Sequence, residues 1–165
     1  MHQLKPISES AIPSALKRAE RYRLLNEPAE AESICLDILE IDPKNRDARI
    51  MLILSLSDQF EERIAAYDEA KDVVAELKKN YDKAYYGGLI CERRARAHMR
   101  RDSHGSGYAA YEWFQRALEE FDTAHDLSPK GNEEALFRWN SIVRTLERNG
   151  SLRPAPEDAT PQLLE

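Results

Sequence analysis

The sequence predicts an all-α protein, and two observations support that fold class. Apolar residues recur at helical spacing from Ser10 to Asn149, without the apolar–polar alternation of a half-buried strand. In addition, one pattern of small and apolar residues occurs twice, at 12, 8, 5 and 2 residues before a proline. The two sets are Ala31, Cys35, Ile38 and Ile41 before Pro43, and Ala117, Phe121, Ala124 and Leu127 before Pro129. Such self-similarity is typical of helical repeat arrays.

The elements follow from this spacing and from the residues that interrupt it. Pro13 falls in the first turn of its helix, where proline is tolerated, Asp42-Pro43 ends the second helix, and Asn149-Gly150 ends the last. Seven helices are expected, over residues 10–25, 28–41, 45–58, 61–79, 82–101, 107–127 and 131–149. Residues 1–9 form an N-terminal arm, residues 10–150 the helical repeat domain, and the proline-rich residues 151–165 a flexible C-terminal tail.

Three of these helices carry distinctive apolar patterns. The helix over 45–58 is apolar on most sides, so we expect it to be buried between neighbours. The stripe of the helix over 61–79 starts at Ile64. The helix over 82–101 has a stripe of small residues that includes Gly88, which indicates a close approach to a neighbouring helix.

Composition and charge limit the functions to consider. The chain has 165 residues, of which 42% are hydrophobic and 33% charged, and its net charge is −6. An acidic chain does not seek nucleic acid or an anionic membrane. We find neither a run of 18 apolar residues nor a secretory signal, so a cytoplasmic location without membrane contact is expected. Cys35 and Cys91 fall on apolar stripes and are expected to be reduced core thiols rather than a disulfide.

The first helix pair resembles a tetratricopeptide repeat. It has the small residue, aromatic residue, alanine, bulky position and terminal proline of that family in order, namely Ala19, Tyr22, Ala31, Cys35 and Pro43. The match is good over residues 12–45, loose over 46–80, and limited to the second half of 82–130. The resemblance implies an α-α superhelix of about three such helix pairs, followed by a capping helix over 131–149.

The spacing of the two proline-terminated patterns departs from the family. Ala31 and Ala117 are 86 residues apart, whereas two repeats of about 34 residues would separate them by about 68. We place a few of the extra residues near 57–62 and most of them within 96–108.

The same resemblance implies a groove that is lined by the first helix of each pair and holds a partner. We expect the partner to be a protein or peptide with an acidic or amphipathic segment. Five residues are candidate groove contacts on this basis: Tyr22, Ile50, Leu54, Tyr86 and Ile90.

An arginine-rich stretch near the end of the helix over 82–101 is the second candidate site. On a helical wheel Arg93, Arg96 and Arg100 share one side, and Arg94 lies next to it. Arginine binds carboxylates and phosphates through paired hydrogen bonds, so this basic face can select an acidic or phosphorylated partner. Nucleic acid is a weaker alternative. The remaining interpretation is a solvated helix overhang whose arginines pair with Glu92 or with carboxylates of the helix over 107–127.

The remaining candidate chemistry is weak. Asp122 and His125 lie three residues apart, but no second pair completes a metal site. The SHGSG loop over 103–107 follows no strand and has no lysine after its last glycine, so it is neither a nucleophile elbow nor a phosphate loop. We expect no metal, no cofactor and no enzymatic activity. The sequence favours a protein–protein interaction adaptor or chaperone-like scaffold. Small acidic secretion chaperones and self-associating structural modules, the latter as homo-oligomers, are the alternatives.

Overall fold

The computed structural model describes residues 2–101 and 103–156, and these fold into seven α-helices without a β-strand. A short 3-10 helix, η1 (Glu9–Ala11), precedes them. The helices are α1 (Ile12–Leu24), α2 (Pro28–Ile41), α3 (Arg46–Ser57), α4 (Ala66–Ala75), α5 (Asn80–Arg100), α6 (Ser106–Leu127) and α7 (Glu134–Arg148). The all-α prediction is therefore confirmed for this part of the chain. None of the described helices is long and apolar enough to cross a membrane.

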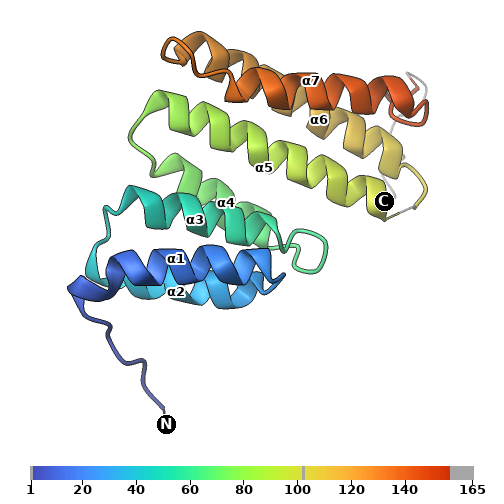
Figure 1. The fold of residues 1–165 in the computed structure, drawn as a ribbon. Helices are drawn as coiled ribbons and strands as arrows, with labels where there is room; N and C mark the ends of the chain where they lie inside the picture. The colour runs from blue at the N-terminus through green and yellow to red at the C-terminus, as the bar shows by residue number, and fades with distance from the viewer. Residues whose placement is uncertain (1, 102, 157–165) are drawn as a thin grey trace, which may run out of the picture.

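Consecutive helices pack against one another in chain order (Figure 1). In that view α1, α3, α5 and α7 lie in front, while α2, α4 and α6 lie behind them. Contacts also join α1 to α3 and α3 to α5. We call the surface built by α1, α3, α5 and α7 the first-helix face, because each of these helices opens a pair or ends the series.

The two proline-terminated patterns occupy equivalent buried places in α2 and α6. Three positions of each pattern are completely buried, namely Ala31, Cys35 and Ile38 in α2, and Ala117, Phe121 and Ala124 in α6. The position two residues before the proline is exposed at Leu127 and half-buried at Ile41. The repeated spacing thus corresponds to a repeated core face, which ends before the last turn.

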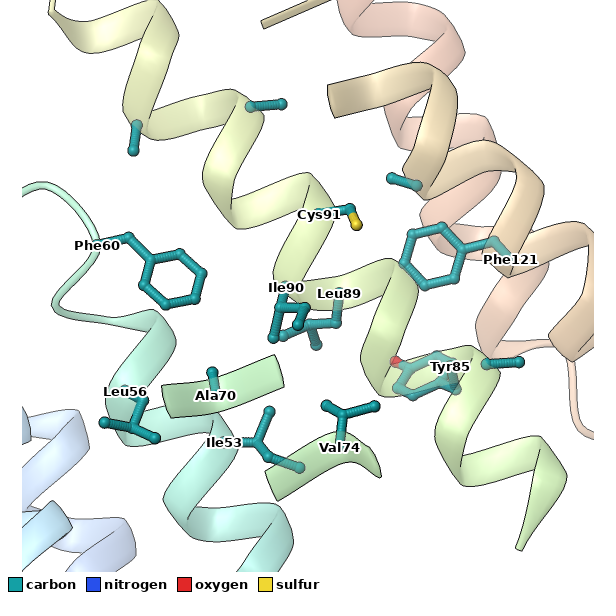
Figure 2. Packing of buried hydrophobic residues seen from close by; sticks show 14 of the residues in the cluster. Ile53, Leu56, Phe60, Ala70, Val74, Tyr85, Leu89, Ile90, Cys91 and Phe121 are labelled. Atoms are coloured by element: carbon teal, nitrogen blue, oxygen red, sulfur yellow. The ribbon is translucent and has the colours of Figure 1, made fainter. Parts of the chain in front are cut away.

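The hydrophobic core extends along the protein between the front and the back layer of helices. Figure 2 shows Ile53 of α3 and Ile90 of α5 directed toward the same space, beside Val74 of α4, and Leu56 of α3 belongs to the same buried cluster. This agrees with the prediction that the third helix is buried between neighbours, because the apolar residues of α3 meet helices on several sides.

The small stripe of α5 brings it close to α6. A Cβ atom added at Gly88 would lie 2.9 Å from two ring carbons of Phe121, which is closer than real contacts allow. Figure 2 shows Phe121 directed from α6 toward α5. The two helices have 21 and 22 residues, whereas α1 to α3 have 12 to 14. The extra residues of the third pair therefore lengthen a closely packed α5–α6 hairpin.

The structure corrects the expected helix over 61–79. The helix α4 begins only at Ala66, and residues 58–65 form a series of turns. Ile64, expected to start the apolar stripe, is exposed. The physical reason is Phe60, whose buried ring packs edge-to-face on Tyr67 at a centroid distance of 5.7 Å. Burying this ring holds the preceding turns against the body, so the helix starts later.

The described end of the chain also differs from the expected tail over 151–165. Leu152 is buried in the main core. The carbonyl oxygen of Ser151 lies against Gly107 at the start of α6, since a Cβ atom added there would be 2.6 Å from it. The boundary of the folded region therefore lies beyond residue 150 because Leu152 covers the end of the long hairpin. Residues 157–165 of the predicted tail lie outside the described residues. At the other end, Leu4 of the predicted arm is exposed, whereas Ile7 packs against the α1–α2 pair.

Cys35 and Cys91 are free, buried thiols, as expected. Burial raises the pKa of Cys35 to about 12 and that of Cys91 to about 11. At about pH 8 we expect neither thiol of the folded protein to react with iodoacetamide, because the thiolate is the reactive species. Both should react after unfolding in guanidinium chloride, as followed by mass spectrometry.

The same two shifts predict how stability depends on pH. Above about pH 9 the thiols of the unfolded chain ionise while those of the folded protein do not, so stability should fall as pH rises toward the folded values. Rapid alkylation of the native protein would contradict both expectations.

Candidate functional site

A cleft of about 590 Å³ opens on the first-helix face and takes side chains from α1, α3, α5 and α7. Five arginines line it, together with three carboxylates, which gives it a formal charge of +2. We call it the arginine cleft. Its charged residues are Arg23, Arg93, Arg96, Arg100 and Arg138, with Asp58, Glu61 and Glu92. The chain has a net charge of −6, so the positive charge of this cleft distinguishes it from the rest of the protein.

Two features noted in the fold position the cleft. The lengthened α5 carries its arginines past the end of α3, and the turns over 58–65 carry two carboxylates beneath them. Phe60 also lines the cleft, so the ring that anchors these turns contributes apolar surface to the site.

Asp58 connects the first three helices of the first-helix face. The guanidinium of Arg23 donates to both of its carboxylate oxygens, with Nε–Oδ2 at 2.7 Å and Nη2–Oδ1 at 3.3 Å. Arg93 donates from Nη1 to Oδ1 at 2.5 Å. One carboxylate at the end of α3 is thus held by arginines of α1 and α5, which fixes these guanidinium groups in place.

Glu92 is the buried carboxylate of the cleft, with a side chain only 3% exposed. Arg96, one turn further along α5, donates from Nε and Nη2 to Glu92 Oε1 at 3.0 and 2.9 Å. Arg138 of α7 donates to Oε2 at 3.5 Å. Although burial opposes its charge, the Glu92 carboxylate and the Tyr85 hydroxyl raise the pKa of Arg138. Arg138 therefore stays charged in the cleft.

Glu61 is bound differently from the other two carboxylates. Among the described residues it pairs with Arg100 alone, and the side chains of Glu61 and Arg100 are 44% and 66% exposed, respectively. Each guanidinium carries more N–H donors than a carboxylate has acceptor sites. Five arginines with three carboxylates therefore leave donor capacity directed into the cleft, with Arg100 as the most exposed of the paired arginines.

The structure brings together three of the four predicted basic-face residues. Arg93, Arg96 and Arg100 all line the cleft, while Arg94 does not. The guanidinium of Arg94 lies over the ring of Tyr67 at 5.4 Å, in a cation–π contact on the α4 side. The cleft partners of the other three are Asp58, Glu92 and Glu61, so the expected pairing with Glu92 occurs but carboxylates of the α6 helix are not among these partners.

The predicted apolar groove residues are not in the arginine cleft. Ile90 is only 2% exposed and lies in the core, so the expectation that it faces a partner is wrong. Its side chain points toward α3 and α4, which cover that side of α5. Tyr22, Ile50, Leu54 and Tyr86 are half-buried and pack against the core. Burial raises the pKa of Tyr86 to about 12.

Sequence reasoning missed Arg23, Asp58, Glu61 and Arg138. A signal for the first two was present, because Arg23 and Asp58 are 35 residues apart, as are Asp58 and Arg93. This spacing is close to one repeat of about 34 residues. It places one charged residue at a corresponding position of three successive helix pairs. Arg138 has no such signal, since the long hairpin interrupts the period.

Comparison with protein-family models, curated proteins and solved structures finds no match to this chain. The fold and the cleft therefore define only the class of protein, which is an all-α protein of sequentially packed helices with an arginine-lined cleft across one face. Within the described residues, no cluster of three or more His, Cys, Asp or Glu side chains is arranged to hold a metal ion.

Proposed function

We propose that this protein is a tetratricopeptide-like interaction scaffold that binds a segment of a partner protein on its first-helix face. The observation that carries the proposal is the arginine cleft, to which α1, α3, α5 and α7 all contribute. A cleft shared by four helices that are separate in sequence is a surface for an extended segment, which can touch several pairs at once. The equivalent burial of Ala31 and Ala117 supports the repeat register.

The arrangement suits binding better than catalysis. The charged groups of the cleft pair with one another, and none of its carboxylates or arginines is next to a nucleophile with a hydrogen-bonded base. Prearranged guanidinium groups lower the entropy lost when a partner binds. The role is therefore that of an adaptor or chaperone-like protein.

Blocking the cleft tests the proposed function. A displayed library of random peptides is screened for binding to the protein, and the affinities of the enriched peptides are measured by fluorescence anisotropy. Ser141 is an exposed cleft residue on α7, so Ser141→Trp should weaken these peptides by about tenfold or more. The matched control is Asn140→Trp, at the neighbouring exposed position that does not line the cleft. Equal affinities in the two variants, or no enriched peptide, would count against the proposal.

A further inference from the structure

The three carboxylates of the arginine cleft are held with very different strength. Asp58 and Glu92 each bind two arginines, and their side chains are largely buried. Removing either from its partners would leave buried charge unpaired. Within residues 2–101 and 103–156, Glu61 binds only Arg100, and both side chains of this pair are exposed. Exposed ion pairs contribute little, so the Glu61 pair is the one that an incoming anion can replace.

The turns that carry Glu61 are anchored without it. Phe60, which precedes Glu61, is buried. Gln59 donates from Nε2 to Glu32 at 2.6 Å and to the Ser55 carbonyl at 3.1 Å. Arg63 also pairs with Glu32. The side chain of Glu61 can therefore leave Arg100 by rotating its own torsions, while the backbone keeps its place.

Resting on the proposed function, we propose that the arginine cleft takes an acidic peptide segment, one carboxylate of which displaces Glu61 from Arg100. The internal carboxylates show the geometry that these guanidinium groups accept, and the positive charge of the cleft complements an acidic partner. Glu61 is then an internal competitor. The apparent affinity for the peptide falls by the fraction of molecules in which Glu61 occupies Arg100.

Two substitutions of equal charge test this inference. The probe is a fluorescein-labelled peptide of alternating glutamate and leucine, with a peptide of alternating glutamine and leucine as its control. Glu61→Gln removes the competitor and should tighten the glutamate peptide by about two- to fivefold, the range expected for an exposed pair. Glu62→Gln removes the same charge from the neighbouring exposed residue, which does not line the cleft, and should have a smaller effect.

A double-mutant cycle separates competition from net charge. In an Arg100→Gln background, Glu61→Gln should no longer tighten the peptide, because the displaced pair is already absent. Thermal unfolding of each variant checks that the fold is retained. The effect should also shrink as salt rises.

The failures of the two proposals differ in outcome. Equal effects of Glu61→Gln and Glu62→Gln, or tight binding of the glutamine peptide, would overturn the acidic-peptide inference while library peptides still report on the scaffold. Displacement of the glutamate peptide by a thymidine oligonucleotide at lower concentration than by unlabelled peptide would instead assign the cleft to nucleic acid. If the library yields no peptide and the glutamate peptide does not bind, both proposals fall.

Discussion

Replacing Phe60 by alanine is expected to lower the free energy of unfolding by about 3–5 kcal/mol. The ring is only 1% exposed, and Figure 2 shows it directed from the turns after α3 toward α5. It also packs edge-to-face on Tyr67, which in turn packs on Trp113 at a centroid distance of 4.9 Å. Truncation would leave a cavity and remove the aromatic contact. Guanidinium chloride unfolding followed by circular dichroism measures the change.

The control for this truncation is Phe137, which is 60% exposed on α7. Phe137→Ala should change stability by no more than about 0.5 kcal/mol, since surface substitutions have small effects. A similarly small loss for Phe60→Ala would mean that the turns over 58–65 do not depend on the ring for their place. The cleft would then lack the support described above.

Replacing Gly88 by alanine is expected to destabilise the protein by about 1–3 kcal/mol through overpacking. The added methyl group would lie 2.9 Å from the Phe121 ring, and that ring is itself completely buried. Neither helix can move away without opening the rest of the α5–α6 contact. Thermal and chemical unfolding of the variant measure the loss.

The neighbouring glycine provides a matched control in the same helix. A Cβ atom at Gly87 would meet only the flexible side chain of Glu120, at 3.5 Å. Gly87→Ala should be neutral or stabilise the protein by up to about 1 kcal/mol, because alanine favours the helix. If both substitutions changed stability equally, the close approach at Gly88 would be wrong. Phe121→Leu should partly rescue Gly88→Ala by making room for the methyl group.

The candidate site was predictable only where one helix supplies it. Helical periodicity places Arg93, Arg96 and Arg100 on one side of α5, and all three line the cleft. Arg94 falls one residue from that side, and its guanidinium packs on Tyr67 instead. Periodicity resolves a helix face to about a third of its circumference, which cannot decide between adjacent neighbours.

Local sequence determined the class of fold and most helix boundaries. Turn residues such as Pro43 and Gly150, and the repeated apolar offsets, act within a few residues, so no knowledge of distant contacts is needed. Exceptions occur where a distant contact overrides the local pattern. Phe60 is buried in the main core, where α4 starts later than expected, and Leu152, in the same core, extends the folded region past the expected boundary.

Tertiary structure alone decided which charges meet. Arg23, Asp58 and Arg93 come from α1, the end of α3 and α5, and Glu92 meets Arg138 across 46 residues of sequence. Such pairs depend on how far each helix extends and how it is rotated, and the long α5–α6 hairpin sets both for the arginine cleft. Helix periodicity is a local property of the chain, whereas a charged cleft between helices exists only after the helices have packed.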